Sequence, residues 1–241
     1  MPEISVVIPA FNEEQRLPNT LEVLQTWVHD NSALCSVKEI IIIDDGSTDG
    51  TSALVKRKAT QWPLLKVFSL PQNQGKGEAV HVGMKQAVGE WILVADADMA
   101  TPWDELKVLL SYVESSDLIM GSRALAGSHI VKRQHWFRQS LGKTFNHLLK
   151  VIMRLPFKDT QCGFKLVKND AVFTNRILPF LEVRRFAWDV ELILFFLKEH
   201  RCVQEVPVRW EHKEHSRVHI VRDSFEMLYT VVKLKVKLLF K

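Results

Sequence analysis

Short, mainly apolar runs alternate with amphipathic segments along the first half of the chain. The runs are five or six residues long, and most are rich in β-branched residues, which is typical of strands buried on both faces of a parallel sheet. They predict strands at residues 4–9, 39–43, 65–70 and 91–95. Apolar positions three and four residues apart predict the helices between them, at residues 17–28, 51–60 and about 75–87. This alternation indicates an α/β fold, with a parallel, doubly wound sheet covered by helices on both faces.

The second half of the chain has a less regular pattern. It predicts a strand at residues 117–121, a turn at 159–165, and helices at 136–153, 170–181, 188–197 and from 224 onward. Residues 203–208 predict an edge strand, because Pro207 cannot donate to a strand ladder. Residues 233–238 alternate apolar and basic side chains, so the period alone leaves helix or strand open there.

Composition favours one globular domain with a sizeable core, since the chain has 241 residues of which 46% are hydrophobic. No stretch of 18 apolar residues occurs and Met1 leads directly into a strand, so we expect neither a transmembrane helix nor a signal peptide. The cysteines Cys35, Cys162 and Cys202 are odd in number and lack metal-ligand spacing. They favour a reducing compartment without a disulfide framework.

The net charge of +4 is unevenly distributed. Residues 1–120 carry 9 Lys and Arg against 17 Asp and Glu, whereas residues 121–158 carry 8 basic residues and no acidic one. An acidic first half suits metal and nucleotide handling. The acid-free stretch suits an anionic partner: phosphates, nucleic acid or a membrane surface.

Two carboxylates, Asp96 and Asp98, directly follow the predicted strand at residues 91–95. Alternate residues of an extended segment point the same way, so both can face one site, and ligands of open α/β sheets bind at this edge. Paired carboxylates need a cation, and their hard oxygens suit Mg²⁺ or Mn²⁺ together with substrate phosphates. Thr101 and Pro102 predict the N-cap and first residue of the next helix. The alternative is a solvated strand end whose acids only cap that helix.

Two further motifs follow neighbouring strands. Asp44 and Asp45 could accept hydrogen bonds from a nucleobase imide or a ribose hydroxyl, whereas residues 47–49 could cap the next helix. Residues 75–77, Gly-Lys-Gly, could form an anion-binding turn at a helix N-terminus, although such a tripeptide is most often only a turn. Neither a Walker A sequence nor the Rossmann glycine pattern occurs, which disfavours a nicotinamide cofactor.

Four ordered motifs resemble those of the inverting family-2 glycosyltransferases of the GT-A fold. They are Val-Val-Ile-Pro-Ala-Phe-Asn-Glu-Glu from residue 6, Ile-Asp-Asp-Gly-Ser-Thr-Asp-Gly-Thr from residue 43, Asn-Gln-Gly-Lys-Gly from residue 73 and Ala-Asp-Ala-Asp from residue 95. Later motifs are similar to those of the polyprenyl-phosphate sugar transferases, at residues 120–123, 159–165, 188–192, 206–208 and 216–218. Within that group, residues 98–101 look closer to the dolichyl-phosphate β-glucosyltransferases than to the mannosyltransferases. The resemblance covers about residues 4–228.

The resemblance implies a role for several individual residues. Those implied to bind the nucleotide sugar are Pro9, Ala10, Glu13, Asp45, Lys76, Asp96 and Ala97. Asp98, with Asp96, is implied to hold Mg²⁺ or Mn²⁺ and the diphosphate. Mannosyl enzymes of the group often carry Gln two residues after the second Asp as a further metal ligand, whereas this chain has Ala100.

The implied reaction transfers a hexose, with glucose from UDP-glucose favoured, to a polyprenyl (dolichyl or undecaprenyl) phosphate with inversion. A phosphate monoester has a second pKa near ~6 and is already anionic at neutral pH, so this acceptor needs no general base. Arg123 and Arg217 are candidates to hold the acceptor phosphate or the leaving diphosphate; ordinary surface ion pairs are the alternative. Asp189, or Glu191, is a candidate base or sugar-hydroxyl anchor, or only the acid of a capped helix end.

A polyprenyl acceptor implies that the enzyme contacts the lipid bilayer. The GT-A domain is expected to cover residues 1–225, with residues 1–120 for the nucleotide sugar and 121–225 for the acceptor. Segment 121–158 suits an amphipathic interface helix, and a basic amphipathic tail, residues 226–241, could add a second contact. We therefore expect a peripheral protein at the cytoplasmic face of a membrane. The alternative is that these apolar faces pack on the core.

Three alternative functions remain open from the sequence. A GDP-mannose-dependent polyprenyl-phosphate mannosyltransferase would use the same chemistry. A nucleotidyltransferase also uses carboxylates and a metal, but its glycine- and Arg/Lys-rich loop is absent from residues 9–13. A nucleic-acid-binding protein would use segment 121–158 and leave the acidic strand ends without purpose, so we expect no nucleic-acid partner.

Overall fold

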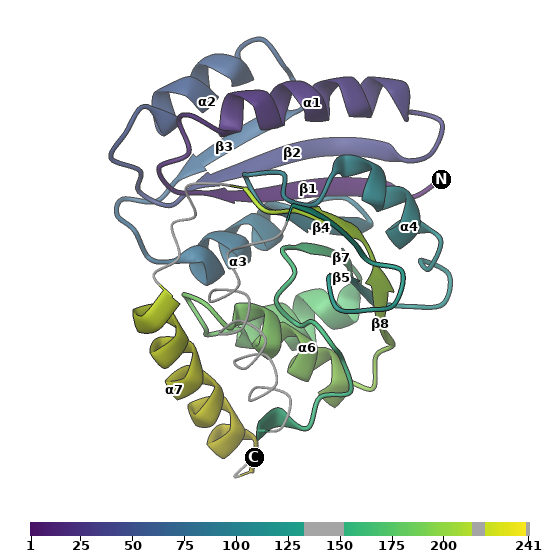
Figure 1. Ribbon diagram of the computed structural model, residues 1–241. Coiled ribbons are helices and arrows are strands. Elements are labelled where there is room, and N and C mark those ends of the chain that lie inside the picture. Colours follow the sequence, from purple (N-terminus) through teal and green to yellow (C-terminus); the bar gives the residue numbers. More distant parts are fainter. Residues whose placement is uncertain (133–151, 214–219, 240–241) are drawn as a thin grey trace.

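A seven-stranded sheet forms the centre of the computed structural model, which describes residues 1–132, 152–213 and 220–239 (Figure 1). Within these residues the strand order is β3-β2-β1-β4-β7-β5-β8. The strands are β1 (Glu3–Ala10), β2 (Ser36–Asp44), β3 (Leu65–Ser69), β4 (Trp91–Ala95), β5 (Leu118–Ser122), β7 (Phe164–Lys168) and β8 (Val203–Pro207). Of these described strands, β7 alone runs antiparallel to its neighbours. The predicted α/β fold with a mostly parallel sheet is confirmed.

Helices cover both faces of the sheet (Figure 1). On one face lie α1 (Leu17–Asp30), α2 (Thr51–Ala59) and α4 (Leu106–Leu110), and on the other α3 (Lys76–Gln86), α6 (Trp188–Lys198) and α7 (Ile220–Leu239). In β2, the side chains of Ile40 and Ile42 belong to the core on the α1 face. Those of Ile41 and Ile43 belong to the core on the α3 face. This strand is apolar at every position along that run because both of its faces are covered.

The topology brings the loops after β1, β2 and β4 to one edge of the sheet. β1 pairs in parallel with β2 on one side and with β4 on the other. The chain therefore reverses its direction of winding between β1 and β4, and open α/β sheets bind ligands at such a switch point.

The sequence pattern misses strand β7. Residues 159–165 are expected to form a turn, but Phe164 and Lys165 begin β7, which pairs with both β4 and β5. Lys165 is fully buried, and a lysine interrupts the apolar run by which an interior strand is recognised. The pattern also misses a two-stranded parallel sheet of β6 (His129–Lys132) and β9 (Arg209–Glu211).

Two predicted helices differ in detail. The N-cap after Asp98 is Pro102 rather than Thr101, and one 3₁₀ turn, Trp103–Glu105, precedes α4. The segment after Asp170 is helical but irregular, with a π-helical turn at Phe173–Ile177 and a 3₁₀ turn at Leu178–Phe180. The predicted edge strand is confirmed, because β8 ends the sheet within the described residues.

The last described residues form one helix. Residues 233–238 continue α7, and the predicted boundary between residues 225 and 226 falls inside it. Its side chains Met227, Val231 and Leu234 are buried in the core on the α3 face. Among the described residues, no helix is both long enough and apolar enough to cross a membrane. Of the helix expected at residues 136–153, residues 136–151 lie outside the described part of the chain.

Candidate active site

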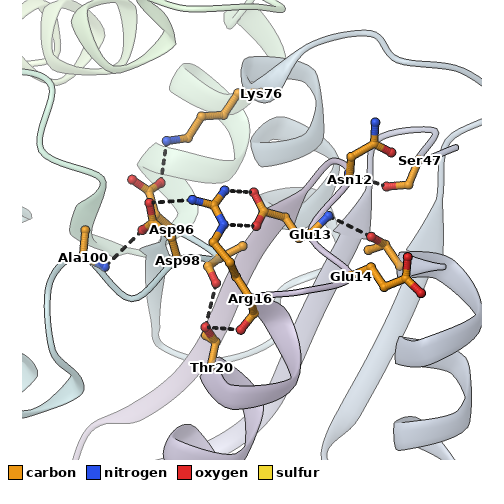
Figure 2. Close-up of polar contacts among 12 residues, drawn as sticks. Asn12, Glu13, Glu14, Arg16, Thr20, Ser47, Lys76, Asp96, Asp98 and Ala100 are labelled. Atoms are coloured by element: carbon orange, nitrogen blue, oxygen red, sulfur yellow. Dashed lines mark hydrogen bonds and ion pairs between the residues drawn. The ribbon is translucent and has the colours of Figure 1, made fainter. Parts of the chain in front are cut away.

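Charged side chains from three loops meet at the carboxyl ends of β1 and β4 (Figure 2). Asp96 lies directly beyond β4 and forms an ion pair with Lys76, the first residue of α3. Both side chains remain partly exposed, at 32% and 29% respectively. Gly163 packs against this carboxylate, since a Cβ there would stand 2.0 Å from Asp96 Oδ2. The loop before β7 therefore helps to place Asp96, a role that the sequence pattern does not reveal.

Asp98 lies on the same turn, close to a second cation. Its Oδ1 accepts a hydrogen bond from the Ala100 N–H at 3.0 Å, and its Oδ2 lies 3.6 Å from Arg16 Nη1. Burial, followed by the like charge of Asp96, raises the pKa of Asp98 against the opposing basic side chains. An additional cation beside Asp98 would favour its ionised form.

Arg16 is a site residue that the sequence reasoning missed. It lies at the N-cap of α1, donates from Nε to Glu13 Oε2 at 2.7 Å and from Nη2 to Glu13 Oε1, and also faces Asp98 (Figure 2). The Glu13 N–H donates to Thr51 Oγ1 at 2.8 Å, which anchors the loop after β1. An acid and a base three residues apart at a helix start was the available signal, but this spacing is too common to single out Arg16.

Backbone groups of the predicted pocket residues join the neighbouring loops. Pro9 and Ala10 are buried at the end of β1, and the Ala10 carbonyl accepts from the Asp45 N–H at 2.8 Å. Ala97 is buried between the two acids, and its carbonyl accepts from Thr20 Oγ1 of α1 at 2.7 Å. The structure thus brings the predicted pocket residues from β1, β2 and β4 together.

The Asp45 carboxylate organises the loop before α3. It accepts from Asn73 Nδ2 at 2.9 Å and from the N–H groups of Gln74 and Gly75 at 2.7 and 2.9 Å. Burial raises the pKa of Asp45 even though these two N–H groups oppose the shift. A carboxylate can accept about four hydrogen bonds, so these three do not exhaust its capacity to accept one from a base.

The glycines at the start of α3 serve chain packing rather than anion binding. The N–H groups of Gly77 and Glu78 donate to the carbonyls of Arg185 and Arg184, at 3.2 and 2.7 Å. A Cβ at Gly77 would stand 2.2 Å from the Val183 carbonyl oxygen. Within residues 75–77, the Gly75 N–H donates to Asp45 and the Gly77 N–H to the Arg185 carbonyl, which favours the alternative that this tripeptide is only a turn.

Arg123, directly after β5, is locked to a buried acid. Its Nε and Nη2 donate to Asp159 Oδ2 and Oδ1 at 2.6 and 2.9 Å, and its guanidinium lies 5.5 Å from the ring centroid of Trp210. Burial alone would raise the pKa of Asp159, but the charge and hydrogen bonds of Arg123 outweigh it and lower this pKa to about 2. Asp159 therefore fixes the position of Arg123 at the site.

Asp189 lies in the first turn of α6, beside a buried lysine. Lys165 Nζ donates to the Cys162 carbonyl at 2.5 Å and lies 4.0 Å from Asp189 Oδ2. Burial raises the pKa of Asp189, while the charges of Lys165 and then Lys76 oppose that rise. Glu191, the alternative candidate, instead accepts from the N–H groups of residues 182 and 183 at 2.9–3.1 Å. Its carboxylate therefore supports that segment. Arg217 lies outside the described residues.

The donor set at Asp96 and Asp98 fits a divalent cation in part. Two adjacent carboxylates supply hard oxygen ligands, which suit Mg²⁺ or Mn²⁺. Within the described residues, no group of three or more His, Cys, Asp or Glu side chains could hold a metal ion. An ion here would therefore need further ligands, such as diphosphate oxygens and water.

Residues 5–180 match the family described as Glycosyl transferase family 2. The chain belongs to this family. Among curated relatives, it is 33% identical to the dolichyl-phosphate β-glucosyltransferase of Dictyostelium discoideum, over 98% of this chain and 75% of that protein. It is 35% identical to the Drosophila melanogaster protein of the same name, over 90% of this chain and 69% of that protein. Within family 2, the chain thus belongs with the dolichyl-phosphate β-glucosyltransferases, as the motifs indicated.

Solved structures with this fold are GT-A glycosyltransferases. Mannosyl-3-phosphoglycerate synthase from Rubrobacter xylanophilus matches with a TM-score of 0.69 at 16% identity, over 99% of this chain and 74% of that one. A UDP complex of glucosyl-3-phosphoglycerate synthase from Mycobacterium tuberculosis matches with a TM-score of 0.66 at 18% identity, over 97% and 80%. A Pyrobaculum calidifontis mannosyltransferase with GDP-Man and Mn²⁺ matches with a TM-score of 0.59 at 18% identity, over 90% and 58%. These structures show the fold. The family match and the curated relatives show that the protein is a glycosyltransferase, which excludes the nucleotidyltransferase alternative.

Proposed function

We propose that this glycosyltransferase moves glucose from UDP-glucose to a polyprenyl phosphate, with dolichyl phosphate as the favoured acceptor, and inverts the anomeric carbon. The carrying observation is the pair of carboxylates Asp96 and Asp98, each beside a basic side chain, at the switch point of the sheet. The relatives named above, which share about a third of its sequence, bear the name dolichyl-phosphate β-glucosyltransferase. Their name supports both the sugar and the acceptor.

In this proposal, the donor diphosphate binds beside Asp98 and Lys76. Asp96 and Asp98 would hold Mg²⁺ or Mn²⁺, which when bound neutralises charge on the diphosphate. Lys76 lies within ion-pair distance of Asp96, so its ammonium is close enough to stabilise the diphosphate as it departs. Asp45 retains capacity to accept the imide N–H of a uracil base.

In this proposal, the acceptor phosphate binds on the side of the sugar opposite to the diphosphate. Its oxygen is already anionic at neutral pH, and it attacks the anomeric carbon as the bond to the diphosphate breaks. Arg123 is preset by Asp159 to hold this phosphate. Asp189 is assigned to the sugar hydroxyls, because a nucleophile that is already charged needs no base.

We place the enzyme peripherally at the cytoplasmic face of a membrane. Helix α7 supports membrane contact: Tyr229, Val232 and Val236 are 71%, 45% and 48% exposed on the helix surface, beside lysines at 233, 235 and 237. Apolar and basic side chains together suit an anionic lipid surface. Sedimentation with anionic vesicles should weaken in Tyr229→Asp with Val232→Asp, and unchanged binding would remove α7 from this role.

The donor and acceptor are tested with purified protein, Mg²⁺, a panel of UDP- and GDP-sugars, and dolichyl or undecaprenyl phosphate. We expect a lipid-linked glucose from UDP-glucose, lost with EDTA and in Asp98→Ala. The matched control is Arg176→Met, because Arg176 pairs with Glu199 at the end of α6 remote from Asp189. Transfer from GDP-mannose alone would establish the mannosyltransferase alternative. Transfer to a soluble alcohol, dependent on Asp189, would remove the lipid acceptor.

A further inference from the structure

We propose that Arg16 is a positioning residue of the donor site, which joins the carboxylate of Glu13 to that of Asp98 and shapes the pocket before the nucleotide sugar arrives. The inference rests on the proposed function, since it assumes that a nucleoside diphosphate occupies this edge. Figure 2 places the Arg16 guanidinium between the two acids, which come from loops far apart in the sequence.

The geometry requires a forked cation. Arg16 presents Nε and Nη2 to the two oxygens of Glu13, while Nη1 lies 3.6 Å from Asp98 Oδ2. A planar guanidinium can meet two carboxylates in this way, whereas a lysine ammonium is a single charged point. Arg16 therefore links the loop after β1 to the turn after β4 through one rigid group.

The surrounding contacts make Arg16 part of a brace. The Thr20 hydroxyl, one turn further along α1, donates to the Ala97 carbonyl at 2.7 Å. The backbone of Glu13 is tied to Thr51 at the start of α2. These bonds hold the start of α1 against the turn that carries Asp98. The Arg16 guanidinium therefore contacts both Glu13 and Asp98 without a large movement of either loop.

Loss of Arg16 would leave three acids close together. The Glu13 side chain is only 9% exposed, so its charge would be poorly screened. Asp96 would keep its ion pair with Lys76, whereas Asp98 would lose the cation that lies 3.6 Å from it. Like charges in a partly buried site repel one another. The pocket would relax, and the donor would have to reorder it on binding, which lowers affinity.

The test compares Arg16→Met, Arg16→Lys and the control Arg176→Met in calorimetric titrations with UDP, with and without Mn²⁺. We expect about tenfold weaker UDP binding for Arg16→Met, equivalent to about 1.4 kcal/mol, and partial recovery for Arg16→Lys. In steady-state assays the KM for the sugar donor should rise, with little change in kcat or in the KM for the acceptor. UDP affinity equal to that of the unmodified protein in a folded Arg16→Met variant would overturn the proposal.

A second variant keeps the test decisive if Arg16→Met does not fold. Arg16→Met with Glu13→Gln removes both charges of the buried pair, which costs less than leaving one unpaired. Nucleotide binding weaker than in Glu13→Gln alone, with a normal thermal melt, would support the role of Arg16, and binding equal to that of Glu13→Gln would overturn it. If the unmodified protein binds GDP instead of UDP, the donor assignment fails, and the Arg16 comparison is made with GDP.

Discussion

Two sets of ion pairs line the two sides of the site, and they differ in exposure. On the donor side, the side chains of Lys76–Asp96 and Arg16–Asp98 are 21–32% exposed. On the side proposed for the acceptor, Arg123 is 31% exposed but its partner Asp159 is only 3% exposed. Exposed ion pairs contribute about 0–1 kcal/mol to stability, whereas removing one partner of a buried pair costs about 3–5 kcal/mol. The charges on the side proposed for the donor can therefore exchange partners for a ligand, while the buried Asp159 holds Arg123 in place on the side proposed for the acceptor.

The largest expected effect separates these two roles directly. Asp159→Asn should lower the free energy of unfolding by about 3 kcal/mol, because Arg123 loses its buried counter-charge. Lys76→Met should change the free energy of unfolding by less than about 1 kcal/mol and still abolish donor binding. Urea denaturation and UDP titration measure the two quantities. Equal destabilisation by the two substitutions would contradict the division.

A smaller effect concerns acid stability. The pKa of Asp159 is lowered to about 2 in the folded protein. Asp159 therefore stabilises the fold fully at pH values above its pKa in the unfolded chain. This stabilisation is lost as the pH falls through its pKa in the folded protein. Protonation of Asp159 between about pH 4 and pH 2 should lower the free energy of unfolding by roughly 2 kcal/mol. Denaturation curves across this range should show a loss of stability that is about 2 kcal/mol smaller in Asp159→Asn than in the unmodified protein. An identical pH dependence in both proteins would refute this role.

The smallest effect sharpens the donor side. In Gly163→Ala, the new Cβ would overlap Asp96 Oδ2, so the carboxylate must rotate away from Lys76. UDP binding should weaken about tenfold, or 1.4 kcal/mol, with little change in the thermal melt. If the effect passes through Asp96, adding Gly163→Ala to Asp96→Ala should cause no further loss. Additive losses would show that Gly163 acts in another way.

Regularity of the chain explains why the first half was predictable. Its strands β1, β2 and β4 are largely buried and are joined by amphipathic helices, so their local preferences agree with the fold. The predicted pocket residues Ala10, Asp45, Asp96 and Asp98 meet because parallel strands carry their following loops to one edge. The motif order was therefore enough to predict that these residues lie together at this edge.

Features that depend on contacts between residues far apart in the chain could not be predicted from the sequence. Lys165 lies in an interior strand next to Asp189, which is 24 positions away in the chain. Gly77 is needed because the segment at Val183 packs against it. Neither relation has a local signature, because the partners are far apart in the chain and meet only in the folded protein.

The sequence by itself determined the mostly parallel α/β sheet, the carboxylates at its edge and the family, because periodicity and ordered motifs are local properties. Only the tertiary structure decided that Arg16 joins Glu13 to Asp98, that Asp159 locks Arg123, and that β7 is a strand with a buried lysine. Charge pairing acts through space, and a partner far away in the chain leaves no periodic trace in the sequence around it.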